Sequence, residues 1–201
     1  MTTSITGCIT MVASIPLPPL DLLKKRFVVD ATSPSGLRHN EPASARFSKG
    51  DAAGGQNHAK GYWQVRVSVD GVSRKYYVHR IIYFLTTGVD PEGMDIDHID
   101  SRQDNLNIRI ATSTQNHANR SKGEKFKGRQ MSSKHKGVYW SKQSKKWQAQ
   151  IKIKGKAYNL GVFAEEDAAA AAYNKAAFIA WGEFARLNVI ENPCSTGGKE
   201  K

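Results

Sequence analysis

The alternation of apolar and polar residues is clearest between Tyr62 and Val69, where every second residue is apolar. This spacing predicts a β-strand with one buried face. Asp70-Gly71 is a hairpin-turn signal, and Arg74 to Val78 is the predicted partner strand. His79 to Thr87 carries apolar residues at helical spacing and precedes Gly88, which predicts a helix and its end.

The stretch before this hairpin is less regular. Leu20 to Phe27 predicts a short helix with leucines on one face, Val28-Val29 a strand, and Ser33 to Gly36 a turn. Residues 41–59 are rich in Ala, Gly, Ser and Asn, so we expect a mobile loop. Residues 1–19 end in a Pro-rich segment, and we expect a disordered tail there.

Two short strands and a helix are predicted next. Met94 to Asp97 and Ile108 to Ala111 have strand-like patterns, and Thr112 or Ser113 is placed to cap a helix. The acid and imidazole of Asp97-His98 therefore come at the end of the first strand of a predicted β-β-α unit.

The pattern changes after Lys134. Strands are predicted over Gly137–Ser141, Lys146–Lys154 and Ala157–Phe163, and a helix over Glu165–Trp181. Small residues at three- and four-residue spacing should let this helix lie close to the sheet. They are Ala169, Ala172, Ala176 and Ala180.

These elements predict an α+β protein with two domains. The first, residues 20–120, contains the β-β-α unit. The second, residues 134–190, is a three-stranded antiparallel sheet packed on one α-helix, and residues 191–201 form a tail. Two interpretations of the linker at residues 121–133 stay open: a solvated connector, and a basic segment that follows phosphates.

The charge balance narrows the class of partner. The 201 residues include 30 Lys and Arg against 18 Asp and Glu, a formal charge of +12, which nucleic acid would neutralise. No apolar run approaches the roughly 20 residues of a membrane-spanning helix. Cys8 and Cys194 show no metal-binding spacing, so we interpret them as free thiols.

The basic residues are concentrated in one part of the chain. Between Arg120 and Lys156 there are thirteen Lys or Arg residues and one acid, Glu124. The sheet face opposite the helix is predicted to present amides and lysines, which suit base edges and phosphates in the major groove. These residues are Gln148, Gln150, Lys152 and Lys154.

The Asp97-His98 pair offers the chemistry needed for phosphodiester hydrolysis. The neutral imidazole of His98 can take a proton from water near pH 7. Asp97 supplies a hard oxygen ligand and Asn116 a second one, and Mg²⁺ needs few protein ligands because it keeps several waters. Asn107 is the best candidate to fix the orientation of His98.

Five motifs follow one another in this half of the chain: His79-Arg80, Asp97-His98-Ile99-Asp100, Asn107-Ile108-Arg109, Ala111-Thr112 and Gln115-Asn116. In this order they resemble the HNH homing endonucleases of phages and introns. The resemblance covers residues 20–120 and is most specific from Val78 to Arg120. It implies a monomer in the cytoplasm of a bacterial or phage-infected cell that cleaves double-stranded DNA without membrane association.

The resemblance also implies a role for each matching residue. Asp97 and Asn116 would bind a divalent ion, Mg²⁺ or alternatively Mn²⁺. His98 would be the general base, oriented by Asn107, and His79 would be structural. The loop between His98 and Asn107 is shorter than is usual in that family, which makes Asn105 a rival to Asn107.

A second set of motifs lies in the C-terminal domain: Lys136-Gly137-Val138-Tyr139, Trp147 to Ile151, Leu160 to Phe163, Ala171 to Asn174 and Ala185 to Asn188. It resembles the plant ethylene-response-factor (apetala-two) DNA-binding domain in the version fused to phage HNH nucleases. The positions that contact DNA in that family are here Lys136, Tyr139, Ser141, Gln150, Lys152, Ala157 and Asn159. Tyr139 and Ala157 replace arginines, so the docking mode carries over but the plant target sequence does not.

Two rival functions are weighed against the nuclease. One is a non-catalytic DNA-binding regulator with a vestigial HNH unit, which has no need of the complete set Asp97, His98, Asn107 and Asn116. The other is an RNA-binding protein, which an exposed aromatic sheet face would favour and a Gln/Lys face does not.

The remaining histidines and two tryptophans are assigned from the pattern alone. We interpret the histidines as solvent-facing and the tryptophans as buried. They are His39, His58, His117 and His135, and Trp140 and Trp147.

Overall fold

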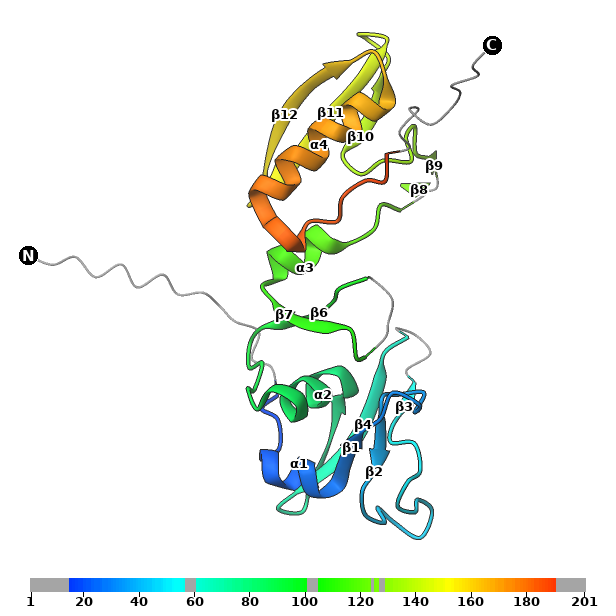
Figure 1. Cartoon of the computed structure of the whole chain (residues 1–201), viewed down its shortest axis with the longest axis vertical. Coiled ribbons are helices and arrows are strands. Elements are labelled where there is room, and N and C mark those ends of the chain that lie inside the picture. The colour runs from blue at the N-terminus through cyan, green and yellow to red at the C-terminus, as the bar shows by residue number, and fades with distance from the viewer. Residues whose placement is uncertain (1–14, 57–60, 101–104, 124, 127–128, 191–201) are drawn as a thin grey trace, which may run out of the picture. The chain divides into compact units, whose positions relative to one another are not determined.

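The computed structural model describes residues 15–56, 61–100, 105–123, 125–126 and 129–190. The chain divides into two compact units, Met1–Thr112 and Ser113–Lys201. Most of their elements are labelled in Figure 1. The helix that was expected to end the N-terminal domain therefore belongs to the second unit.

The first unit begins with a helix and a short hairpin. Helix α1 (Leu20–Arg26) is followed by β1 (Phe27–Val29), which pairs antiparallel with β2 (Leu37–His39). Leu23 is fully buried, which confirms the predicted apolar face of α1. Strand β2 has no counterpart among the predicted elements, because three residues are too short for an alternation to show.

A three-stranded sheet of order β3-β4-β5 carries the predicted hairpin. Its strands are β3 (Gly55–Gln56), β4 (Trp63–Val69) and β5 (Val72–Tyr77). Asp70 and Gly71 have φ of 50° and 76°, as expected for the two central residues of a tight hairpin turn.

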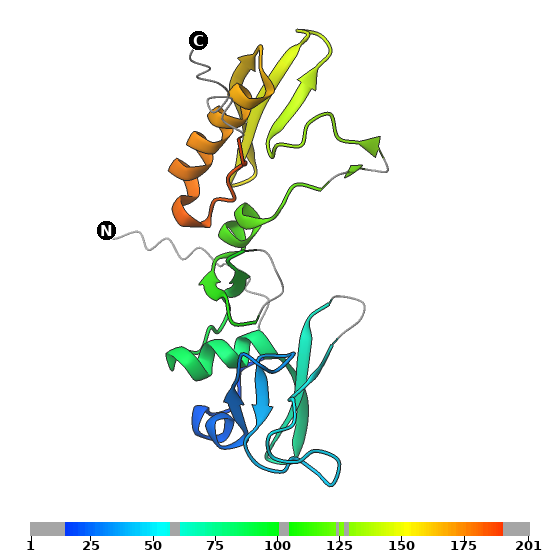
Figure 2. The same ribbon diagram turned by 45° about the vertical axis from the view of Figure 1, so that its right-hand side comes forward.

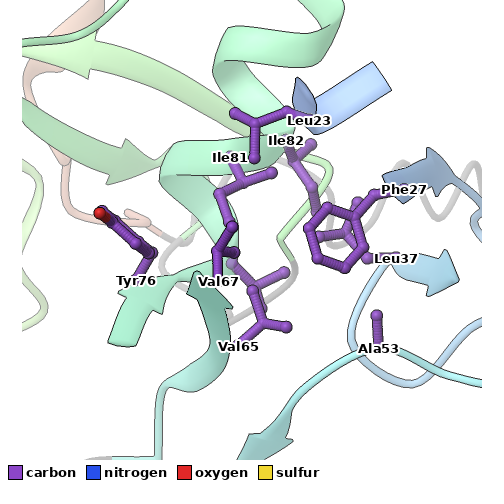
Figure 3. Close-up of a cluster of buried hydrophobic side chains, with 10 residues drawn as sticks. Leu23, Phe27, Leu37, Ala53, Val65, Val67, Tyr76, Ile81 and Ile82 are labelled. Carbon is purple, nitrogen blue, oxygen red and sulfur yellow. The ribbon is translucent and has the colours of Figure 1, made fainter. Parts of the chain in front are cut away.

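Helix α2 (Val78–Thr87) covers one face of this sheet and ends at Gly88, whose left-handed backbone donates its N–H to the Phe84 carbonyl. Figure 3 shows the isoleucines of α2 pointing toward the valines of β4. The core that they share with α1 and the first hairpin comprises Leu23, Phe27, Leu37, Val65, Val67, Tyr76, Val78, Ile81 and Ile82.

Part of the segment expected as a mobile loop is built into this core. Ala53 is fully buried and its carbonyl accepts a 2.7 Å hydrogen bond from the Ser35 hydroxyl. Two residues later β3 pairs with β4. The segment gave no alternation because its residues are small and several of them are held by backbone hydrogen bonds. Residues 57–60 lie outside the described part of the chain.

A separate hairpin follows α2. Strand β6 (Asp95–His98) pairs antiparallel with β7 (Ile108–Ala111), and Asp97 lies directly opposite Arg109 in the register. Both strands are confirmed, and His98 is the last residue of β6. Within the loop between them, residues 101–104 lie outside the described part of the chain.

The second unit begins with α3 (Ser113–Asn119) and a small hairpin of β8 (Lys125–Phe126) and β9 (Arg129–Gln130). The predicted antiparallel sheet then follows in the order β10-β11-β12. Its strands are β10 (Val138–Ser141), β11 (Lys146–Ile153) and β12 (Lys156–Phe163). Figure 2 shows helix α4 (Glu166–Trp181) along one face of this sheet, with the short turn η1 (Gly182–Phe184) after it.

The predicted alanine stripe of α4 is confirmed in part, because Ala169 is buried and Ala172 and Ala176 pack partly buried against the core of this unit. The buried positions are Ala169, Ala170, Tyr173 and Ala177. Tyr173 sits where Gly137 leaves space: a Cβ at that glycine would lie 2.0 Å from the Tyr173 ring. The buried side of α4 therefore combines small alanines with one tyrosine, which the spacing of the alanines did not predict.

Two of the histidines are buried, contrary to the prediction. His39 is 7% exposed and lies between the rings of Phe27 and Phe47. His135 is 3% exposed, and its Nε2 lies 3.0 Å from a carboxylate oxygen of Asp167. Each is buried because a partner distant in sequence covers it.

His117 is exposed as predicted. Trp140 packs edge-on against Trp147, yet it is 40% exposed instead of buried. His58, Cys8 and Cys194 lie outside the described residues. Within the described part of the chain, no helix has the length and apolar character to cross a membrane.

Candidate functional site

Asp97 is the most deeply buried acid among the described residues of the first unit. Its residue surface is 2% exposed, and its Oδ2 accepts a 3.0 Å hydrogen bond from Nε of Arg109 on the facing strand. A buried carboxylate is tolerated only beside a positive partner, and Arg109 supplies that charge. The hairpin register thus fixes the position of the predicted metal ligand.

His98 follows Asp97 and therefore points to the opposite side of β6. Its half-buried ring contacts the ring of His79 edge-on at 5.5 Å between centroids and that of Tyr62 at 6.1 Å. Tyr77 stacks on His79 at 5.3 Å and meets Tyr62 at 5.8 Å. We call these four residues, Tyr62, Tyr77, His79 and His98, the ring cluster.

His79 occupies the centre of the ring cluster. It is 8% exposed, and burial lowers its pKa to about 3, with the neighbouring His98 and Arg80 adding to the decrease. Among the residues that the structure describes, its Nδ1 is a buried atom without a hydrogen-bond partner. A neutral, buried imidazole suits the packing role that was predicted for it.

Arg80 links α2 to the turn before β6. Its guanidinium donates to the carbonyl of Met94 at 3.2 Å and to that of Glu92 at 2.7 Å, and it lies 3.9 Å from the Asp90 carboxylate. The His79-Arg80 pair therefore connects α2 to β6 on both sides: His79 through the ring cluster and Arg80 through the turn.

The two candidate residues for orienting His98 have different surroundings. Asn105 is 5% exposed, and its Nδ2 donates to the carbonyl of Ser35 at 2.8 Å. Asn107 is exposed, and its main-chain carbonyl accepts a 3.0 Å hydrogen bond from the amide of Ile99. Asn105 thus anchors the loop to the first hairpin, whereas Asn107 closes the loop immediately after His98.

Asn116 lies on α3 and so belongs to the second unit. Among the described residues, no group of three His, Cys, Asp or Glu side chains could hold a metal ion. The predicted donor set is smaller, with one carboxylate from Asp97 and one carboxamide from Asn116. Both are hard oxygen donors, so their chemistry fits a hydrated divalent cation such as Mg²⁺.

Most of the predicted DNA-contact residues lie on the face of the β10-β12 sheet opposite α4. Tyr139 pairs with Gln148 across the sheet, and Gln150 with Asn159. The α4 side of the same strands buries Val138, Ala149 and Ile151. The outward set therefore comprises Tyr139, Ser141, Gln148, Gln150, Lys152 and Asn159, with Lys154 in the adjoining turn and Ala157 exposed opposite Lys152.

Lys136 is the exception among the predicted DNA contacts. It precedes β10 and is half-buried. Its Nζ donates hydrogen bonds to the main-chain carbonyls of Ala118 and Arg120. The structure thus places its ammonium at the end of α3 and not on the outer face of the sheet.

Sequence reasoning missed the residues that support the site. The importance of Arg109 becomes visible only from the hairpin register, which sets it opposite Asp97. Tyr62 and Tyr77 come from two different strand ends and gather around His98 only in three dimensions. Alternation alone assigned Tyr62 to the polar face of its strand and gave no signal.

A family model described as HNH endonuclease matches residues 76–118. The matched segment runs from the end of β5 through α2 and the β6-β7 hairpin into α3, and includes Asp97, His98, Asn107 and Asn116. No curated protein and no solved structure gave a match. The match indicates nuclease activity on DNA, and HNH endonucleases generally use a divalent metal ion.

Proposed function

We propose that this chain is a metal-dependent DNA endonuclease, similar to homing endonucleases, that hydrolyses phosphodiester bonds in double-stranded DNA. The observation that carries the proposal is the β6-β7 hairpin inside the matched segment. It presents a buried acid and an imidazole on opposite sides of one strand, with Arg109 fixing the first and the ring cluster packing around the second.

In this proposal His98 is the general base. It takes a proton from the attacking water, whose oxygen forms a bond to phosphorus while the bond from phosphorus to the 3′ oxygen breaks. The neutral rings of Tyr62 and His79 restrict the rotation of His98, and Asn107 holds the loop that follows it. His79 serves the structure and does not take part in proton transfer.

Asp97 and Asn116 are the proposed ligands of the divalent ion, Mg²⁺ or Mn²⁺. When bound, such an ion stabilises the negative charge that develops on the phosphate and on the leaving oxygen. Arg109 keeps the Asp97 carboxylate in one orientation through its hydrogen bond.

The second unit is proposed to hold the chain on DNA as a monomer. The outer face of its sheet combines amides with lysines, and the helix α4 leaves this face uncovered (Figure 2). Lysines neutralise phosphates, and carboxamides can read base edges. A module of this kind raises the local concentration of the nuclease at its target.

A non-catalytic DNA-binding regulator is the competing function. One observation favours it: Arg109 already neutralises Asp97 through an ion pair. A regulator would bind DNA equally well whether or not a divalent ion can be held.

Incubation with supercoiled plasmid separates the two functions. Parallel reactions contain Mg²⁺, Mn²⁺ or EDTA, with wild type and Asp97→Ala. The proposal predicts relaxed or linear product with wild type and metal, none with EDTA, and strongly reduced product with Asp97→Ala. DNA binding with no metal-dependent product under any condition would establish the regulator instead.

A further inference from the structure

The C-terminal end of α3 is held by a lysine from outside the helix. Nζ of Lys136 donates to the Ala118 carbonyl at 2.5 Å and to the Arg120 carbonyl at 2.8 Å. The last carbonyls of a helix have no partner within the helix, and a cation at that end is favoured by the helix dipole. Lys136 therefore supplies hydrogen bonds that a helix of seven residues needs for stability.

Lys136 is itself fixed to α4. Its amide donates to Oδ1 of Asn188 at 2.6 Å, and its carbonyl accepts from Nδ2 of the same residue at 3.1 Å. Asn174 of α4 in turn exchanges two hydrogen bonds with the main chain of Asn188, at 2.7 and 2.9 Å. Because the backbone of Lys136 is already fixed by these hydrogen bonds, its side chain loses less conformational entropy when it binds the end of α3.

A second contact converges on the same carbonyl. The amide of Arg186 donates to Ala118 at 3.3 Å. Ala118 and Asn119 are only 4% and 6% exposed. Helix α3 thus packs on α4 and η1 through its last turn, and the contact is made by residues that flank the sheet module on both sides.

We propose that Lys136 is a positioning residue that fixes α3, the helix that carries Asn116, to the C-terminal sheet module. Its role is this fixation, and not the phosphate contact expected from the sequence. The module is then part of the cleavage unit as well as a DNA-binding element. The consequence for cleavage rests on the proposed function, whereas the fixation of α3 is independent of it.

The surroundings of the ammonium agree with this role. Burial, together with the nearby positive charge of Arg186, lowers the pKa of Lys136 to about 8. A lysine that neutralises phosphates on an open face, such as Lys152, is exposed instead. The half-buried ammonium is therefore suited to bonding with main-chain carbonyls.

Hydrogen–deuterium exchange of the full chain, without metal or DNA, tests the fixation. In Lys136→Met the amides of residues 113–120 should exchange about tenfold faster than in wild type, the equivalent of about 1.4 kcal/mol. Lys136→Arg should restore most of the protection, because a guanidinium can donate to the same carbonyls. Lys142→Met removes an exposed lysine of the same module and should leave α3 unchanged. Unchanged exchange of α3 in Lys136→Met overturns the proposal.

A measurement on the wild type covers the case in which Lys136→Met unfolds the whole module. With ¹⁵N-labelled lysine, the proposal predicts a slowly exchanging Nζ signal with couplings across hydrogen bonds to the carbonyls of Ala118 and Arg120. A Lys136 ammonium that exchanges with water as fast as the exposed lysines do contradicts it.

Two activity readouts separate this inference from the proposed function. DNA affinity of Lys136→Met should stay within a few-fold of wild type, while cleavage should require more Mn²⁺ for half-maximal rate. A large loss of affinity with unchanged α3 exchange would make Lys136 a phosphate contact and overturn the inference. If wild type does not cleave, the proposed function fails, and the exchange result still decides the role of Lys136.

Discussion

The two three-stranded sheets of this chain are packed on their helices in opposite ways. The β3-β5 sheet meets α2 through large aliphatic side chains, with Val65 and Val67 against Ile81 and Ile82. The β10-β12 sheet meets α4 through alanines, with Tyr173 as the one large buried side chain of that helix. The first interface is filled by side-chain volume, whereas the second depends on the close approach of backbones.

This difference sets the kind of substitution to which each unit is sensitive. Removing volume leaves a cavity in the first core, because close-packed neighbours relax only partially. Adding a larger side chain destabilises the second core, because its closely packed backbones leave little room for further atoms. Four changes, in order of decreasing effect, test this contrast and its link to function.

Gly137→Ala should have the largest effect. The new Cβ would lie 2.0 Å from the Tyr173 ring and 2.6 Å from the Gln150 carbonyl, at a backbone φ of +75°. We expect the second unit to lose roughly 4 kcal/mol or more of unfolding free energy. Urea denaturation followed by tryptophan fluorescence measures this loss. Gly155→Ala, at φ +81° with nothing within 4 Å, should cost only about 1 kcal/mol, and equal costs would refute the packing argument.

Ile81→Ala should destabilise the first unit by about 3 kcal/mol, because Ile81 is fully buried between the sheet and α1. Exchange protection of β4 and β5 should fall, while that of β11 and β12 stays unchanged. Ile179→Ala removes the same atoms from a residue that is 76% exposed and should change stability by less than about 0.5 kcal/mol. Loss of protection in both units would mean that they unfold together.

Acidification should destabilise the first unit through His79. Above pH 6.5 this residue is neutral in both states. Below pH 6.5 His79 binds a proton in the unfolded chain. In the folded chain it stays neutral until the pH approaches its lowered pKa of about 3. Stability is therefore lost from pH 6.5 downward at about 1.4 kcal/mol per pH unit, or roughly 2 kcal/mol by pH 5.

The slope of this loss is measured by urea unfolding at several pH values. His79→Gln lowers overall stability but should remove this part of the pH dependence. An identical slope in wild type and His79→Gln would show that His79 is not the titrating group.

Neutralising Lys152 and Lys154 should change the free energy of unfolding least of the four changes, but it should clearly alter the salt dependence of DNA binding. The slope of log affinity against log salt should decrease by about 0.9 for each phosphate that the double variant no longer neutralises. The control is Lys175→Gln, because Lys175 is an exposed lysine on α4 and so lies away from the sheet's outer face. Equal slopes in the double variant and wild type would put the DNA on a different surface.

The elements that were predictable are those long enough for their burial to follow a period. Strands β4 and β11 have seven and eight residues, and their alternation shows which face is buried. The short strands β2 and β3, with three and two residues, are too short for a periodic pattern to show in the sequence. Membership of α3 in the second unit depends on contacts from Lys136 and Arg186, which are distant in sequence.

For the candidate site, the sequence predicted which residues supply the chemical groups but not which residues hold them in place. Asp97, His98 and Asn116 lie in the segment that the HNH endonuclease family model matches. The partners that fix them could not be found from spacing. Arg109 requires the hairpin register, and the ring cluster requires the approach of two strand ends to α2. Lys136 has the chemical type of a phosphate contact, and only the structure shows that its ammonium donates to the carbonyls of Ala118 and Arg120.

We propose that His98 in the first unit is the general base of cleavage and that the outer sheet face of the second unit holds the DNA. The most direct test is to measure plasmid cleavage and DNA affinity in parallel for wild type, His98→Ala and the exposed-histidine control His117→Ala. The account predicts that His98→Ala abolishes metal-dependent cleavage and leaves affinity within a few-fold, while His117→Ala cleaves. Full cleavage by His98→Ala, or a large loss of its affinity, would contradict the account.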